Sequence, residues 1–314
     1  MPVIATKCAE RRDGDPVSER LHDIVRQTVY QPVPPAVAVL GEAMKARFGD
    51  SLLAVIFYGS CLRSGNPRDG LVDLYVIVSD YAAAFPGWRA RSLARWVPPT
   101  VSYIEIGTDN GPVRAKYAVL SLRDFRRGTS SRWFHPYLWG RFAQPCRVDQ
   151  VRDPETGDIV VESLANAART LLAQTRPLLD AGRPPAEQWA RALSMSYATE
   201  LRPESEDRSR ELVEANRDHY DAVWRALDAG PPPTPSAARR ARAAWAIRRR
   251  TGKAMSVLRW LKALTTFEGG IDYAVWKLER HSGVRVEVPD RVRRRPWLYV
   301  WPELLRLYRQ GVLR

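Results

Sequence analysis

The sequence has little cysteine and histidine and contains no long apolar run. Its three cysteines, Cys8, Cys61 and Cys146, are an odd set without paired spacing, which excludes a disulfide framework and a cysteine-based zinc site. Four histidines are too few to suggest a histidine metal site. No apolar stretch approaches the roughly 20 residues that span a bilayer.

The N-terminal segment lacks the apolar core of a secretory signal, and it already contains Glu10, Asp13, Asp15 and Glu19. Unpaired cysteines are usual in a reducing compartment. Together these features predict a cytoplasmic protein, either soluble or bound peripherally to the inner face of a membrane.

Acidic residues are scarce only in the last quarter of the chain. Residues 1–238 contain 30 basic and 29 acidic side chains, whereas residues 239–314 contain 19 basic and 6 acidic ones. The net charge of +14 therefore lies almost entirely at the C-terminal end. A cationic surface of this kind favours a polyanion, either nucleic acid or an anionic bilayer.

Short apolar runs predict buried strands at residues 52–57, 71–78 and 101–106. A turn sequence joins the third run to a fourth at residues 115–121, which predicts a hairpin. Helical periodicity is present before the first strand, with a break at the prolines of residues 32–35, and again over residues 122–142. The predicted fold class is α/β with a mixed sheet.

Beyond residue 150 the pattern predicts helices at residues 162–179, 186–199, 208–227 and 237–266. The proline-rich stretch 230–235 is typical of a stiff linker. We expect an α/β domain at residues 1–150, a mainly helical domain at 151–230 and a basic amphipathic region at 231–314.

The candidate chemistry begins where the first strand reaches Tyr58-Gly59-Ser60. A glycine turn there exposes backbone N–H groups and a hydroxyl to a phosphate, and Asp73 on the next strand is placed to hold Mg²⁺. A Gly-Ser pair is often an ordinary turn, but a carboxylate inside an apolar strand requires a partner such as a metal ion. The order of strand, Gly-Ser, loop and acid resembles the nucleotidyltransferase signature.

Further motifs resemble one family of that superfamily, the mitochondrial phosphatidate cytidylyltransferases, also described as mitochondrial translocator assembly and maintenance proteins. The similar segments, in the family's order, are Lys116-Tyr117 in a strand, the stretch 136–145 with Gly140 and Arg141, the stretch 193–202 with Glu200 and Arg202, and the helix with Ser256, Arg259 and Lys262. The family has two apolar residues after its aspartate, so Tyr75 in place of a second acid agrees with its pattern. Cys61 and Ala118 replace family glycines, and residues 267–314 match nothing in it.

The resemblance implies transfer of CMP from CTP to phosphatidic acid with release of pyrophosphate, and Mg²⁺ as cofactor. The residues it implies, with Tyr58 added from the strand end, are Asp73, Lys116 and Glu200 for catalysis, Tyr58, Gly59, Ser60, Arg141, Arg202, Arg259 and Lys262 for the nucleotide, and Asp73 and Glu200 for the metal. Glu105, in the predicted hairpin, is a further candidate for the second metal ligand. It is an equally good ion-pair partner for Lys116, and both interpretations stay open.

The predicted helix 237–266 carries nine lysines and arginines among apolar residues. A helix of this kind can lie on an anionic bilayer, or it can pack by its apolar face with the charges in solvent. Trp297, Tyr299 and Trp301, beside a run of arginines, suit the headgroup region. Since the implied substrate is a lipid phosphate, an anionic membrane is favoured over nucleic acid as the partner.

Two other functions are compatible with the sequence. One is a nucleotidyltransferase that acts on RNA, a protein or a small molecule. The other is a catalytically decayed transferase fold that binds membranes, which Tyr75 and Cys61 suggest.

Overall fold

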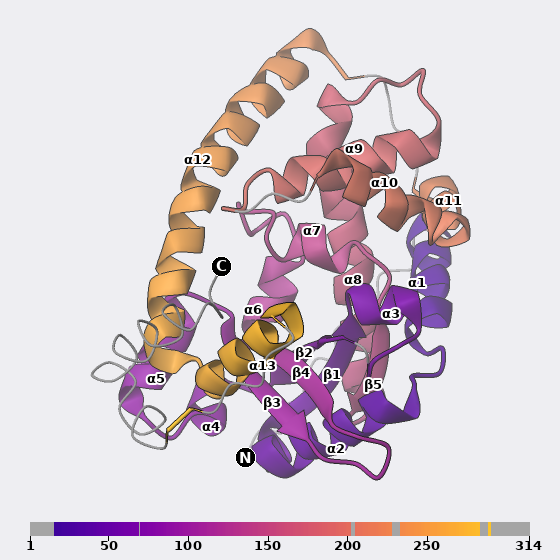
Figure 1. The fold of residues 1–314 in the computed structure, drawn as a ribbon. Helices are drawn as coiled ribbons and strands as arrows, with labels where there is room; N and C mark the ends of the chain where they lie inside the picture. The colour runs from indigo at the N-terminus through magenta and orange to yellow at the C-terminus, as the bar shows by residue number, and fades with distance from the viewer. Residues whose placement is uncertain (1–15, 69, 202–204, 228–232, 283–287, 290–314) are drawn as a thin grey trace, which may run out of the picture.

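The computed structural model of the chain describes residues 16–68, 70–201, 205–227, 233–282 and 288–289. A five-stranded sheet lies at its centre, with helices packed on both faces (Figure 1).

The sheet is mixed, as predicted, with the strand order β3-β4-β2-β1-β5. β1 (Leu52–Tyr58) lies between two antiparallel neighbours, β2 (Val72–Val78) and β5 (Arg147–Val151). β2 runs parallel to β4 (Val113–Ser121), and β4 pairs with β3 (Thr100–Ile106) in the predicted hairpin. The three apolar runs are confirmed as strands, while β5 was not predicted because its sequence is half polar.

Successive side chains of β1 enter two different cores. Ile56 and Tyr58 pack on one face, under α1 (Pro16–Val29) and α8 (Pro154–Thr175). Val55 and Phe57 pack on the other, under α2 (Pro35–Phe48). Burial on both faces explains why this strand is a continuous apolar run without alternation.

The first core also extends beyond the predicted boundary at residue 150. It joins strand residues to Leu164 of α8, Trp189 of α9 (Pro185–Tyr197) and Trp245 farther along the chain. The α/β and helical regions therefore share one hydrophobic core, which fixes the helical residues relative to the sheet.

Two predicted helices are interrupted. The stretch 122–142 forms α6 (Leu122–Gly128) and α7 (Trp139–Phe142), and the stretch 208–227 forms α10 (Glu206–Glu214) and α11 (Arg217–Ala226). In the second case the Asn216 side chain donates to the Leu212 carbonyl at 3.0 Å, a local bond that competes with helix continuation. Expecting single helices there was wrong, because periodicity does not register such breaks. The shorter elements are α3 (Ser60–Ser64), α4 (Tyr81–Ala84), α5 (Trp88–Trp96) and 3₁₀ turns at Gly49–Ser51 and Arg176–Leu178.

The basic helix is present as α12 (Pro235–Thr266), and the Thr234 hydroxyl caps its first turn. The side of α12 that packs on the protein contains Trp245, Arg248, Gly252, Ser256 and Lys262, all buried. A Cβ on Gly252 would lie 2.6 Å from the Thr199 carbonyl oxygen, so glycine permits this close approach.

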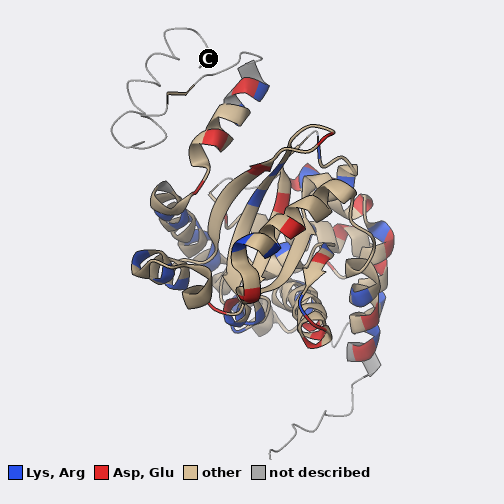
Figure 2. Cartoon of the chain, turned by 90° about the horizontal axis from the view of Figure 1, so that it is seen from below, with Lys and Arg blue, Asp and Glu red and all other residues tan. Residues whose placement is uncertain are grey.

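The outward side of α12 carries several large apolar residues. Ile247, Val257, Leu258 and Leu261 are exposed, by 44–56%, and at helical spacing they lie opposite the buried stripe. Of the two interpretations left open by the sequence, packing by the apolar face describes Trp245 but not these four residues. Figure 2 shows blue without red along α5 and α12, neither of which contains an acidic residue.

α13 (Gly270–Ser282), which was not predicted, follows α12 and contacts β3 through Tyr273 and Tyr103. None of the described helices combines the length and apolar character that crossing a membrane requires. The predicted aromatic segment with Trp297, Tyr299 and Trp301 lies outside the described residues, as do residues 230–232 of the proline-rich linker.

Candidate functional site

β1 ends in a turn that needs a residue without a Cβ. Gly59 has φ +89°, and a Cβ at this position would lie 2.6 Å from Oδ2 of Asp73. Ser60 follows as the first residue of α3, which ends at Gly65 with φ +67°. Glycine at position 59 therefore serves two purposes, because it permits the left-handed backbone and leaves room for the Asp73 carboxylate.

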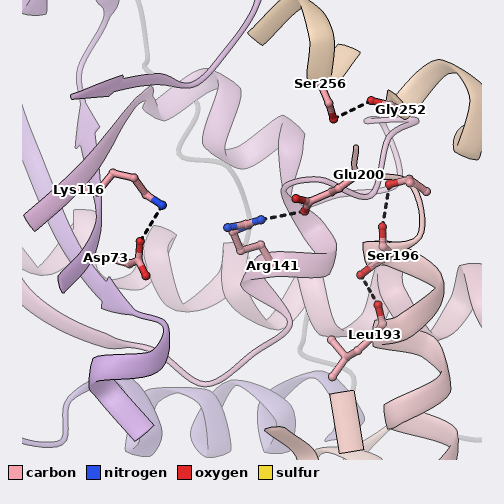
Figure 3. Close-up of polar contacts among 9 residues, drawn as sticks. Asp73, Lys116, Arg141, Leu193, Ser196, Glu200, Gly252 and Ser256 are labelled. Carbon is pink, nitrogen blue, oxygen red and sulfur yellow. Dashed lines mark hydrogen bonds and ion pairs between the residues drawn. The ribbon is translucent and has the colours of Figure 1, made fainter. Parts of the chain in front are cut away.

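Asp73 lies beside Lys116 on the neighbouring parallel strand. The two residues are register partners, and Nζ of Lys116 is 3.1 Å from Oδ1 of Asp73 (Figure 3). The side chain of Asp73 is 21% exposed, so its charge needs a partner, as the sequence predicted. The nearby carboxylate raises the pKa of Lys116, which keeps this lysine charged.

Glu105 lies apart from this pair. The β3–β4 register places Tyr103 opposite Lys116 and Glu105 opposite Arg114, whose Nε donates to Glu105 at 2.9 Å. The interpretation of Glu105 as the ion-pair partner of Lys116 is therefore wrong, because Glu105 lies two residues beyond the register partner of Lys116. Two strand spacings and two residues separate the Cα atoms of Asp73 and Glu105 by about 12 Å. The fold does not bring their carboxylates together, and this speaks against Glu105 as the second metal ligand.

A second ion pair faces the first across the site. Nη2 of Arg141, on α7, is 2.8 Å from Oε1 of Glu200, which follows α9. Figure 3 shows the Arg141 guanidinium between the Asp73–Lys116 pair and Glu200. Burial is the largest single influence on Arg141 and opposes its charge, but Glu200 and the neighbouring tyrosine hydroxyls together outweigh it, so the pKa of Arg141 is raised.

α12 adds two more cations. The Arg259 guanidinium lies 3.8 Å from the centre of the Tyr137 ring and donates to the Pro98 carbonyl at 3.3 Å. Lys262 is buried, and its Nζ donates to the carbonyls of Val97 at 2.7 Å and Pro99 at 2.9 Å. Burial, with a smaller effect of Arg259, lowers the pKa of Lys262 to about 7.

Tyr75 lies two residues after Asp73 on β2. It lies on the same face of β2 as Asp73, and its ring centre is 5.0 Å from that of Tyr58 and 4.5 Å from that of Phe142. A carboxylate there would be buried among aromatic rings. Asp73 therefore has no acidic neighbour two residues along its own strand.

Two hollows meet at the Arg141–Glu200 pair, which lines both of them. The smaller, of about 160 Å³, is lined also by Tyr58, Gly59, Ser60 and Asp73. The larger, of about 420 Å³, is lined also by Lys116, Arg259 and Lys262 together with the apolar side chains of Val101, Leu201, Trp260 and Phe267.

The fold thus gathers most of the predicted site residues around these two hollows. Glu105 is outside the set, and Arg202 lies outside the described residues. Tyr137 and Trp260 line the larger hollow and were not predicted. Tyr137 lies one helical turn before Arg141, a spacing that could have drawn attention to it.

The described residues contain no group of three acidic, histidine or cysteine side chains close enough to form a metal cage. Mg²⁺ rarely needs one, because it usually takes one or two carboxylates and completes its shell with water and substrate phosphates. Asp73 and Glu200 both line the smaller hollow, although each is held by a cation. These residues fit a magnesium ion that arrives with a phosphate ligand. Neither a family model nor a curated protein matches this chain.

Proposed function

We propose that this protein is a phosphatidate cytidylyltransferase of the nucleotidyltransferase superfamily, which transfers CMP from CTP to phosphatidic acid. The observation that carries the proposal is the contact between the Gly59 turn and Asp73, next to a cluster of cations that have room for phosphate groups. The order of motifs in the sequence supplies the family and the choice of substrates.

The smaller hollow suits the triphosphate of CTP. Ser60 and the N–H groups of the turn can donate to phosphate oxygens, and Arg141 faces them from the opposite side. Mg²⁺, when bound by Asp73 and the triphosphate, would offset charge on the departing pyrophosphate. Lys116, released from Asp73, can neutralise a phosphate oxygen in its place.

The reaction moves one phosphorus between two oxygens. An oxygen of the lipid phosphate attacks the α-phosphorus of CTP, the bond from that phosphorus to the β-phosphate oxygen breaks, and its electron pair leaves with pyrophosphate. No proton needs to be removed from an ionised phosphate nucleophile. The protein then acts by positioning the two phosphates and by offsetting their charge. Lys116, Arg141 and Arg259 are suited to offset this charge.

The larger hollow suits the acceptor. It combines basic side chains, including Arg259 and Lys262, with the apolar side chains of Trp260 and Leu201. A lipid phosphate has the same mixture of charge and apolar surface. Since the Arg141–Glu200 pair lines both hollows, the α-phosphate of CTP and the acceptor phosphate would meet at Arg141.

The outward face of α12 suits an anionic bilayer as the source of this acceptor. Leu258 and Leu261 are exposed beside Trp260, which itself lines the larger hollow. No acid is present anywhere on α12, so its cations favour anionic lipid while its apolar side chains enter the interface. A membrane bound there would lie at the mouth of the proposed acceptor site.

Vesicle sedimentation tests this membrane contact. We expect Leu258→Ser/Leu261→Ser to lose binding to phosphatidylcholine vesicles that contain phosphatidic acid. Val39→Ser, an exposed apolar position on α2, is the matched control and should bind normally. Equal binding by all three proteins would contradict a membrane role for α12.

Label transfer from CTP carrying radioactive α-phosphate tests the acceptor. Incubation with phosphatidic acid, RNA or protein substrates should label only the lipid. Label in RNA or protein would favour the other nucleotidyltransferases. Asp73→Asn should abolish transfer, whereas Asp180→Asn, an exposed control, should retain it.

A decayed transferase is the second candidate, because Tyr75 packs in the core where a second carboxylate is often found. Millimolar CTP with Mg²⁺ should raise the melting temperature of a competent protein. No increase, together with no label transfer, would favour the decayed fold.

A further inference from the structure

A third hollow, also lined by cations, lies at the end of the sheet opposite to Asp73 and Lys116. It has a volume of about 960 Å³ and opens beside Ser79, just after β2, and Leu122, just after β4. Asp73 and Lys116 lie six residues earlier on these same strands, which corresponds to about 20 Å of extended chain. This hollow is therefore separate from the two hollows of the candidate site.

Arginine dominates the lining of this hollow. The five arginines are Arg123, Arg126, Arg127, Arg132 and Arg169, and Glu162 is the one acidic residue among the lining side chains described. Hydroxyl and amide groups complete the wall, from Ser79, Ser130, Ser131, Ser163, Asn166 and Thr170. We name this set the arginine groove.

Neighbouring carboxylates do not explain this concentration of charge. Among the described residues, no ion pair joins Arg123, Arg126, Arg127 or Arg132 to an acid. Arg169 donates to the neutral amide oxygen of Asn166 at 3.1 Å. Arg123, Arg126, Arg127 and Arg132 therefore add positive charge to the groove, and none of these four forms an ion pair with a described acid.

Helix structure accounts for only part of the cluster. Arg126 and Arg127 lie in the last turn of α6, where the helix dipole favours a cation. Arg123 lies in the first turn of the same helix, where the dipole disfavours one. Arg132 and Arg169 come from a turn and from the middle of α8, so three separate elements place guanidinium groups around one hollow.

The position of the groove is also suitable for a ligand. β2 and β4 are the parallel neighbours of this sheet, and the groove lies at their carboxyl ends. In open α/β sheets, ligands commonly bind in the crevice outside the carboxyl ends of parallel strands. Arg127 is held in place by the Trp133 ring, 5.4 Å from its guanidinium carbon, which leaves the charge available to an anion.

We propose that the arginine groove binds a compact polyphosphate, a di- or triphosphate group, at a site distinct from the one around Asp73. Guanidinium groups bind phosphate oxygens bidentately, and several of them favour a ligand with more than one phosphate. No aromatic side chain is among the described lining residues, so a nucleotide base adds little to binding. The proposal does not depend on the activity proposed above.

Hydrogen exchange with the full chain and inorganic triphosphate tests the proposal. We expect inorganic triphosphate to slow exchange in peptides covering residues 122–132. The affinities of CTP and ATP for the groove should lie within a few-fold of that of inorganic triphosphate. Arg123→Gln/Arg127→Gln should remove this protection and weaken binding at the groove by about tenfold or more. Arg239→Gln/Arg240→Gln, an equal charge change on exposed residues of α12, should leave it intact.

Exchange in residues 59–65 reports the site around Asp73 separately, so the outcomes at the two sites are distinguishable. Unchanged exchange at residues 122–132 would overturn the proposal. Protection in the Arg123→Gln/Arg127→Gln variant equal to that in the wild type would also overturn it. Protection by sulfate equal to that by triphosphate at matched ionic strength would overturn it as well, because it would indicate general screening of charge.

Discussion

Gly59→Ala offers a sharp test of how the turn and Asp73 depend on each other. The alanine must adopt φ +89° with ψ −159°, a region essentially restricted to glycine, which costs about 1–3 kcal/mol. Its Cβ would also lie 2.6 Å from Oδ2 of Asp73, well inside van der Waals contact. Relief of such an overlap in a packed region costs about 1–3 kcal/mol more.

The Asp73 side chain can escape the overlap only by moving. Because Oδ1 of Asp73 is bound to Lys116, this movement disturbs the ion pair at the centre of the candidate site. We therefore expect Gly59→Ala to lower the free energy of unfolding by about 2–6 kcal/mol in urea titrations. CMP transfer should fall at least about tenfold, since each 1.4 kcal/mol lost from the transition state is tenfold in rate.

Gly65→Ala is the matched control. Gly65 also has a positive φ, +67°, but nothing lies within 4 Å of a Cβ placed there. This variant should lose only the backbone contribution of about 1–2 kcal/mol and should keep its activity. Equal destabilisation in the two variants, or full activity in Gly59→Ala, would refute the reasoning.

Three further predictions concern charged groups. Burial lowers the pKa of Lys262 to about 7, so the folded protein binds fewer protons than the unfolded chain between about pH 7 and 10.5. The contribution of Lys262 to the free energy of unfolding should therefore rise with pH across this range. Urea titrations of Lys262→Met should show a flatter rise. Burial raises the pKa of Asp149 to about 6, and its Oδ2 is buried without a hydrogen-bond partner. Between about pH 4 and 6 the folded protein therefore binds more protons than the unfolded chain, and the stability that Asp149 contributes falls as the pH rises. The free energy of unfolding of Asp149→Asn relative to the wild type should grow over that interval and then level off. A double-mutant cycle on Arg141→Ala and Glu200→Ala should give a coupling of about 1–3 kcal/mol, and a coupling near zero would contradict a structural ion pair.

The sheet could be predicted because its strands carry their own signal. β1 is apolar throughout, since it is buried on both faces, and Gly59 follows at the point where the chain must turn left-handed. Asp73 was identified for a similar reason, because a charge inside an apolar strand implies a partner. The identity of that partner was not predictable, since it depends on β4 lying beside β2 in one register.

The orientation of α12 could not be predicted, because periodicity does not tell which face of a helix is covered. The sequence left open whether the apolar side lies on a bilayer or packs on the protein, and the packed side combines the fully buried Trp245 with Gly252, Ser256 and Lys262. Beside the core contacts of Trp245, this interface contains a close approach to Thr199 and hydrogen bonds to the carbonyls of Val97 and Pro99. Such contacts join residues more than fifty positions apart, and no local pattern encodes them.

The most direct test of the central claim is the lipid product itself. The full chain, incubated with CTP, Mg²⁺ and vesicles containing phosphatidic acid, should yield CDP-diacylglycerol by mass spectrometry. Asp73→Ala should yield none, while Asp180→Asn should match the wild type. No CDP-diacylglycerol from the wild-type protein, or an undiminished amount from Asp73→Ala, would contradict the account.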